Sequence, residues 1–195
     1  CFGSQTEQRV LRLVANYDGE RSVDINAAIY VTMSIGLVEQ AAHLVRFTHD
    51  MIQKATIESI CNEDLVPLLR KLIESILHSS SSAGELGSVL FVVVDLVNRI
   101  GSDAKSSEQE RVTFANLHLQ AGLKAIAAPD FAGAAKYAEK GIAFLSDTCW
   151  ETDYELSLGL YETAVVSHFS NLTGDRDMLM NRMGAVFEFA KDFSD

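Results

Sequence analysis

Two adjacent side chains of types that could do chemistry stand near the end of the first quarter of the sequence. They are His49 and Asp50. Such a pair binds metal in metal-dependent hydrolases, but the centre also needs at least one more His and one more Asp. The other histidines stand alone, without His or Asp neighbours at ligand spacing: His43, His78, His118 and His168. We therefore interpret the pair as structural and keep a metal-dependent hydrolase as a weaker hypothesis.

Asp50 has a simpler role at the start of a helix. Apolar and small residues follow it at i, i+3, i+4, i+7 and i+8, which predicts an amphipathic helix: Ile52, Ala55, Thr56, Ser59 and Ile60. With Gln53 three residues on, Asp50 fits an aspartate version of the capping box. An N-cap aspartate stabilises a helix by roughly 1 kcal/mol. This interpretation explains Asp50 without any chemistry.

Four acidic residues lie close together further along: Asp147, Glu151, Asp153 and Glu155. Carboxylates are the ligands that Ca²⁺ prefers, but this group lacks the residue order and the closing glutamate of a calcium loop. We interpret it as a solvated acidic face.

Three aromatic residues in the same region could form a ligand surface: Trp150, Tyr154 and Tyr161. Aromatic side chains at such spacing more often pack the junction between two helical repeats. We interpret them in this way, and we predict no catalytic, cofactor-binding or metal-binding residue in the chain.

Several other polar positions also need no function. They are Glu139 and Lys140, together with His118 on an apolar face. Four consecutive serines, 79–82, could be phosphorylated, but a flexible linker is the simpler interpretation.

Composition limits the classes of partner. The chain has 195 residues, of which 48% are hydrophobic, and only two prolines, which favours a folded, helix-rich protein. The net charge is −11, and residues 145–195 contain three basic and ten acidic residues. Such a surface repels nucleic-acid backbones and anionic lipid, so we expect neither nucleic acid nor membrane as a partner.

The cysteines indicate the compartment. Cys1, Cys61 and Cys149 are odd in number and far apart, which is neither a disulfide framework nor a metal knuckle. We therefore expect a reducing, cytoplasmic setting.

The elements that position these residues follow from periodicity. Helical spacing over 7–17 is followed by Asp24, which could cap a helix over 25–38. Two short extended pieces come next, with Val45 and Phe47 on one side and Arg46 and Thr48 on the other. Together with the helix after Asp50, they predict a winged-helix unit with a small β-hairpin. Because no Lys or Arg lies between residues 21 and 46, we interpret this unit as a packing module and not as a DNA reader.

Longer helices are predicted downstream. Residues 63–80 place six apolar side chains on one face, and the spacing over 86–100 favours a helix despite the strand-like run "VLFVVV". From residue 110 onwards, 128–145 aligns with 173–190 at an offset of 45, with Pro129-Asp130 against Gly174-Asp175. Gly122 lies 12 residues before Ala134, a spacing used in tetratricopeptide-type helical hairpins. Such repeats stack into a curved solenoid.

Four ordered segments resemble one family: "FTHDMIQKATIESI" (47–60), "DLVNRIG" (95–101), "ERVTFANLHLQAGLKAIAA" (110–128) and "AAKYAEKGIAFLSDTCWETDYELSLGLYETAVV" (134–166). They are similar to the regulatory region of large signalling proteins that join a STAND-class, AAA-type (Orc1-like) ATPase to a serine/threonine or hybrid histidine kinase. Thr56 and Ile57 depart from the Ala-Tyr pair of that family, and the serine-rich loop departs from its usual acidic helix.

The resemblance implies a mainly α fold in three parts. Residues 1–62 would be a winged-helix-like module that closes the ATPase, 63–108 connecting helices and 109–195 tetratricopeptide-like repeats. The catalytic parts of the family are absent, since the sequence has neither a GxxxxGK[ST] loop nor kinase motifs. ATP is therefore implied for the parent protein and no cofactor for this chain.

Besides the metal-dependent hydrolase, two functions remain open at this stage. The first is a non-catalytic regulatory segment that contacts the adjacent ATPase domain or binds a protein or peptide on its repeats. Because the first methionine is Met33 and two repeat units are few, we expect a piece of a longer protein. The second is a stand-alone helical adaptor whose acidic repeat surface binds a basic peptide.

Overall fold

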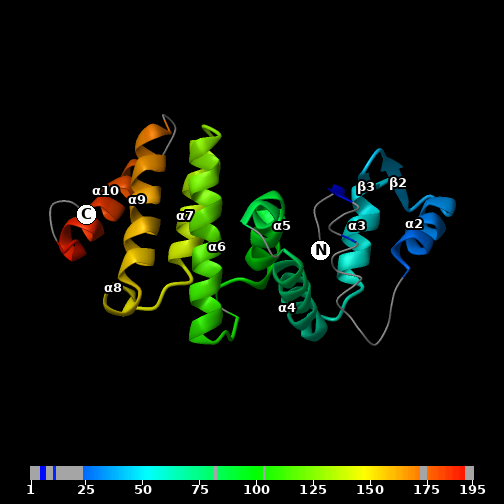
Figure 1. Cartoon of the computed structure of the whole chain (residues 1–195), viewed down its shortest axis with the longest axis horizontal. Helices are drawn as coiled ribbons and strands as arrows, with labels where there is room; N and C mark the ends of the chain where they lie inside the picture. The colour runs from blue at the N-terminus through cyan, green and yellow to red at the C-terminus, as the bar shows by residue number, and fades with distance from the viewer. Residues whose placement is uncertain are drawn as a thin grey trace. The chain divides into compact units, whose positions relative to one another are not determined.

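The described part of the chain is mainly helical, as the sequence predicts, with a small antiparallel sheet (Figure 1). The computed structural model describes residues 5–7, 11, 24–80, 83–102, 104–171 and 175–191. The chain divides into two compact units, Cys1–Ile100 and Gly101–Asp195.

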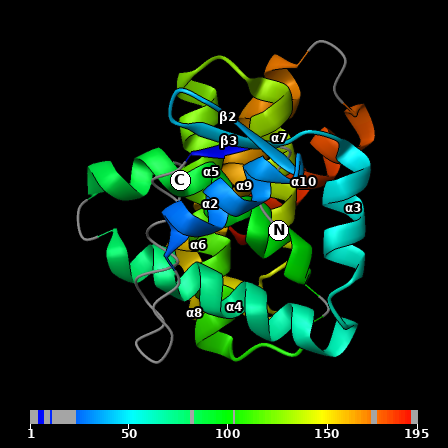
Figure 2. The same ribbon diagram turned by 90° about the vertical axis from the view of Figure 1, so that its right-hand side faces the viewer.

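The sheet of the first unit has three strands, in the order β1 (Gln5–Glu7), β3 (Leu44–Phe47) and β2 (Val38–Ala41). The predicted hairpin is confirmed, because β2 and β3 pair antiparallel around a two-residue turn (Figure 2). Val45 is buried and Arg46 exposed, as the alternation requires. Strand β1 was not expected, since a helix was predicted from residue 7. The other apolar residues of that predicted helix, apart from Leu11, lie outside the described residues: Val10, Val14 and Tyr17.

Helix α2 (Ile25–Ser34) begins where the sequence predicts and ends earlier. The Asp24 carboxylate accepts hydrogen bonds from the backbone N–H groups of Asn26 and Ala27. The predicted helix over 25–38 is wrong beyond Ser34, because Gly36 has a φ of 72°. Its N–H donates to Met33 O and that of Leu37 donates to Thr32 O, which is a Schellman end. The chain is thereby turned into β2.

Helix α3 (Asp50–Glu58) starts one residue earlier than the capping-box interpretation requires. The carbonyl of His49 accepts from the N–H groups of Ile52 and Gln53, so Asp50 is the first helical residue instead of the cap. Its carboxylate still lies at the positive end of the helix dipole, where a negative charge is favourable.

Helices α4 (Asn62–Ser79) and α5 (Ala83–Ile100) pack on each other and contribute most of the buried apolar side chains among the described residues of the first unit. The buried side chains include Leu69, Ile73, Ile76, Val89, Leu90, Val93, Leu96 and Val97. The helical interpretation of "VLFVVV" is confirmed, because its branched residues continue a longer helical face.

The long helices of the second unit run in alternate directions: α6 (Glu108–Ala127), α7 (Phe131–Ile142), α9 (Tyr154–Ser170) and α10 (Arg176–Phe189) (Figure 1). The short α8 (Cys149–Thr152) lies in the connection between α7 and α9. Asp130 caps α7 by accepting from the Gly133 N–H, and Asp175 caps α10 by accepting from the Asp177 and Met178 N–H groups. The starts of α7 and α10 are 45 residues apart, which equals the offset of the predicted repeat.

Small residues let α9 pack closely against both α6 and α7. A Cβ atom on Gly122 would lie 2.9 Å from Thr163 Cγ2, and one on Gly141 would lie 2.5 Å from Leu160 Cδ2 and 3.0 Å from His118 Cβ. Because Leu160 and His118 are fully buried, neither can move aside into solvent.

We therefore expect Gly141→Ala to lower the free energy of unfolding by about 1–2 kcal/mol, because overpacking outweighs the gain in helix propensity. Urea unfolding measures this change. Gly184→Ala in α10 is the matched control: a Cβ there meets nothing within 4 Å, so we expect a gain of up to about 1 kcal/mol. Equal effects at the two positions would contradict close packing at Gly141.

Candidate interaction site on the C-terminal helices

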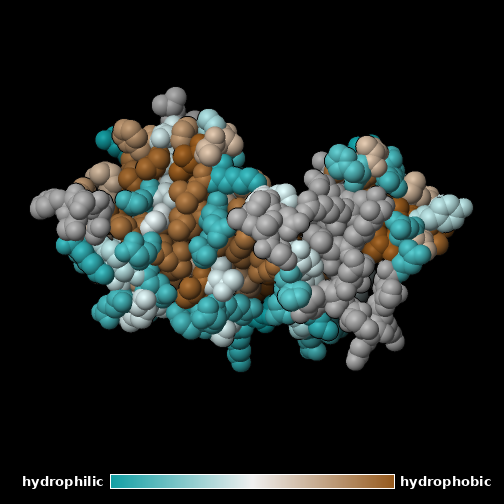
Figure 3. Space-filling view, in the orientation of Figure 1, coloured by the Kyte–Doolittle hydropathy of each residue, from teal (hydrophilic) through white to brown (hydrophobic). Residues whose placement is uncertain are grey.

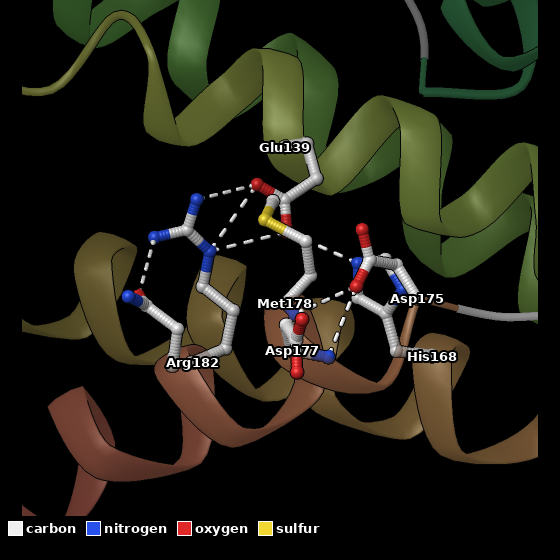
Figure 4. Close-up of polar contacts among 7 residues, drawn as sticks. Glu139, His168, Asp175, Asp177, Met178 and Arg182 are labelled. Carbon is white, nitrogen blue, oxygen red and sulfur yellow. Dashed lines mark hydrogen bonds and ion pairs between the residues drawn. The ribbon is translucent and has the colours of Figure 1, made fainter.

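Glu139 of α7 is the centre of a half-buried polar cluster that joins three helices (Figure 4). Arg182 of α10 donates to both carboxylate oxygens, with Nη2 2.6 Å from Oε2 and Nε 3.1 Å from Oε1. His168 of α9 places Nε2 3.1 Å from Oε1. The three side chains are only 10–21% exposed, so solvent and salt screen their charges weakly. The cluster therefore ties α7 to α9 and α10.

The same arginine contacts an aromatic ring. Its guanidinium carbon lies 5.4 Å from the centre of the Tyr161 ring. Hydrogen bonds to Glu139 raise the pKa of Arg182, which keeps it charged. Burial raises the pKa of Tyr161, which keeps the phenol neutral at pH 7. The charges of Glu139 and Arg182 thus neutralise each other, and their ion pair holds α7 and α10 together.

The three aromatic residues noted in the sequence form one cluster with a residue of α10. The Trp150 ring stacks on Phe189, with centroids 5.2 Å apart, and lies 5.0 Å from Tyr161 and 6.0 Å from Tyr154. The Tyr154 hydroxyl accepts from the backbone N–H of Lys191 at 2.8 Å. The rings pack against Trp150 in stacked, tilted and edge-on arrangements and join α8, α9 and the end of α10, so the packing interpretation fits the structure.

An apolar groove, here called the α9/α10 groove, lies between the last two helices. It has a volume of about 200 Å³ and is lined by Glu162, Val165, Val166, Met183, Val186 and Phe187. Phe187 is 80% exposed and Val166 is 46% exposed. Figure 3 shows apolar side chains gathered in stripes along the helices of this unit. Large apolar side chains at such exposure typically mark a surface that another element covers.

The α9/α10 groove occupies the same place in the repeat as a groove that is already filled. Leu160 and Thr163 of α9 fit between α6 and α7, where they meet Gly141 and Gly122. At the offset of 45 residues, Ile142 at the end of α7 corresponds to Phe187 of α10. A helix placed on α9 and α10 as α9 is placed on α6 and α7 would cover the groove.

The other candidates from the sequence stay apart. His49 and Asp50 are exposed, as are Asp147, Glu151 and Glu155. Among the described residues, no group of three or more His, Cys, Asp or Glu side chains is placed to hold a metal ion. Cys61 is an exposed and Cys149 a buried free thiol, while Cys1 lies outside the described residues.

The sequence predicted no functional role for Glu139 and His168. Glu139 and His168 are 29 positions apart in the sequence, and Glu139 and Arg182 are 43 positions apart. Local spacing therefore gives no sign of these contacts. The only signal is that each is a charged or titratable residue within an otherwise apolar helical pattern. Such a signal identifies candidates and leaves their partners open.

The chain matches no protein-family model, and no curated protein or solved structure matches it either. None of the helices in the described ranges has the combined length and apolar character that crossing a bilayer requires.

We expect Glu139→Gln to lower the free energy of unfolding by about 2 kcal/mol, because it removes the charged acceptor of a half-buried arginine. Thermal or urea unfolding at pH 7 measures the loss. Glu39→Gln is the control: its ion pair with Arg46 is equally short, at 2.6 Å, but about half exposed, so we expect a loss of less than about 1 kcal/mol. Similar losses for the two variants would contradict the prediction that burial makes the Glu139 ion pair the more important one for stability.

His118 lies in the core of the same unit. It is fully buried, and its Nδ1 lies 2.8 Å from the Phe114 carbonyl. Burial, with a smaller contribution from the positive charge of Lys140, lowers its pKa to about 4, although the hydrogen bond to Phe114 acts in the opposite direction.

Because the unfolded chain binds this proton near pH 6.5 and the folded chain does not, His118 makes stability fall as pH drops from about 6.5 to 4. As the pH falls through this window, the free energy of unfolding of the wild type should fall by up to about 3 kcal/mol more than that of His118→Gln, in which this titration is absent. Urea unfolding at several pH values measures the difference. The two proteins contain the same carboxylates, so the effect of their titration cancels in the comparison. Parallel pH profiles would contradict the prediction.

Proposed function

We propose that this chain is a non-catalytic regulatory and interaction segment of a large cytoplasmic signalling protein that joins a STAND-type AAA ATPase to a protein kinase. ATP would bind elsewhere in the parent protein. The chain itself would work by contacts with protein, in its own parent or in a partner, and with neither nucleic acid nor membrane.

The open α9/α10 groove carries this proposal. It repeats a groove that α9 fills between α6 and α7, and it exposes Phe187 and Val166. A helix that covers it would bury apolar surface at about 25 cal/mol per Å², which is the main driving force of helix docking. In the regulatory reading, a further helix of the parent supplies this cover.

The first unit offers a second apolar surface, around α2. Figure 3 shows it at the right of the view. Only Ile29 of this helix is buried, whereas Tyr30 is 74%, Ile35 63% and Val31 55% exposed. A winged-helix-like module that closes an ATPase would present such a face to the nucleotide domain. Docking that differs between nucleotide states would couple the segment to the ATPase.

The acidic charge around the α9/α10 groove favours one alternative function, that of a stand-alone adaptor. Glu162 lines the groove, Glu188 is exposed beside Phe187, and residues 145–195 contain ten acidic residues against three basic ones. A stand-alone adaptor would use this surface to bind a basic amphipathic peptide helix. The two functions differ in whether the helix comes from the same chain or from a partner.

The test extends this chain at its C-terminus by the 45 residues that its transcript encodes next. If the extension supplies the helix, we expect the melting temperature of the second unit, Gly101–Asp195, to rise by roughly 4–8 °C. A gain of about 1 kcal/mol in the free energy of unfolding has this effect in a domain of about 60–100 residues. Phe187→Glu should abolish the rise, whereas Val31→Glu, on α2 of the other unit, should leave it unchanged.

An unchanged melting temperature, or a rise that survives Phe187→Glu, would contradict the regulatory proposal. Binding of a basic amphipathic peptide to the chain without the extension, lost in Phe187→Glu, would favour the adaptor. Rapid ATP hydrolysis by the isolated chain would contradict both.

A further inference from the structure

A second groove, here called the lysine groove, lies along α7 where it meets the end of α9 and the start of α10. Its volume is about 470 Å³. Three alanines of the α7 segment line it: Ala132, Ala135 and Ala143. Its charged and polar lining consists of Lys136, Glu139, Lys140, His168, Asn171 and Asp175. Figure 4 shows how Glu139, His168 and Asp175 lie there.

Both carboxylates of the lysine groove already accept hydrogen bonds from other groups. Glu139 accepts from Arg182 on both of its oxygens. Asp175 uses Oδ1 to cap α10, at 3.0 and 3.1 Å from the backbone nitrogens of the second and third residues of the helix. Neither carboxylate forms an ion pair with a lysine of the groove.

The two cations of the groove are not occupied. Lys136 and Lys140 are exposed, and neither forms an ion pair or a hydrogen bond with any of the residues that the structure describes. At positions i and i+4 of one helix, their Cβ atoms are about 6 Å apart on the same side. The groove wall also contains His168, which is nine-tenths buried and whose Nδ1 has no hydrogen-bond partner among the described residues.

We propose that the lysine groove binds an acidic peptide segment of a protein through a pair of its carboxylates. The two ammonium groups would each hold one carboxylate, and the alanines would contact the aliphatic carbons of the peptide. Alternate side chains of an extended peptide lie about 7 Å apart on one side, which matches the spacing of the lysines. This site is separate from the α9/α10 groove and does not depend on the parent protein proposed above.

The probe is a blocked peptide with glutamates at alternate positions, acetyl-Ala-Glu-Ala-Glu-Ala-amide. Its charge of −2 limits repulsion by the acidic chain at physiological salt. Titrated into the isotopically labelled full chain, it should shift the amide signals of Lys136, Lys140 and Ala143, with a dissociation constant of about 1 mM or lower. The glutamine version of the peptide should cause no saturable shift.

The double variant Lys136→Gln and Lys140→Gln should weaken binding by about tenfold or more, while Lys124→Gln, which removes one exposed positive charge on α6, should change it by less than about twofold. The lysines are exposed, and the melting temperature of each variant confirms that it is folded. The absence of binding, equal binding by the double variant, or equally tight binding of free glutarate in place of the peptide would each overturn the proposal.

Discussion

The carboxylate of Glu139 is the constraint on which the arrangement of the last helices depends. It lies half-buried among α7, α9 and α10, where it needs a charged partner, and Arg182 meets it with two donors while His168 contacts the same oxygen. Removing one member leaves a charge with little access to water. The position of α10 relative to α7 is therefore tied to an electrostatic contact as much as to apolar packing.

Close approach of the helix backbones makes that contact possible. Gly122 and Gly141 leave space that Thr163 and Leu160 fill, which brings α9 into the groove between α6 and α7. Helix α9 then has a second role, since its outer side forms the next groove together with α10. A repeat built in this way always presents one uncovered groove at its end. The function that we propose uses this uncovered groove as the docking surface for a helix.

Much of this fold follows from local sequence signals. The periodicity of residues 86–100 identifies α5 although "VLFVVV" favours a strand, because seven apolar positions at helical spacing outweigh the preference of a six-residue run. Asp24, Asp130 and Asp175 mark helix starts through side-chain chemistry that acts over two or three residues.

Interactions between distant residues could not be predicted in the same way. The end of α2 depends on the positive φ of Gly36, whose place in a helical pattern suggested that the helix continues. Strand β1 forms through pairing with β3, about 40 positions away, and has only three residues to signal it. The partners of Glu139 are brought close only by the packing of α7, α9 and α10, so that a residue to which the sequence assigned no function lies at the centre of a cluster.

The central claim, that this chain regulates a larger ATPase–kinase protein, is tested most directly by reading its transcript on both sides. The account predicts an upstream reading frame with a GxxxxGK[ST] phosphate-binding loop and a downstream frame that continues the helical repeat with a period near 45 residues. A start codon immediately before Cys1 and a stop codon immediately after Asp195 would contradict it.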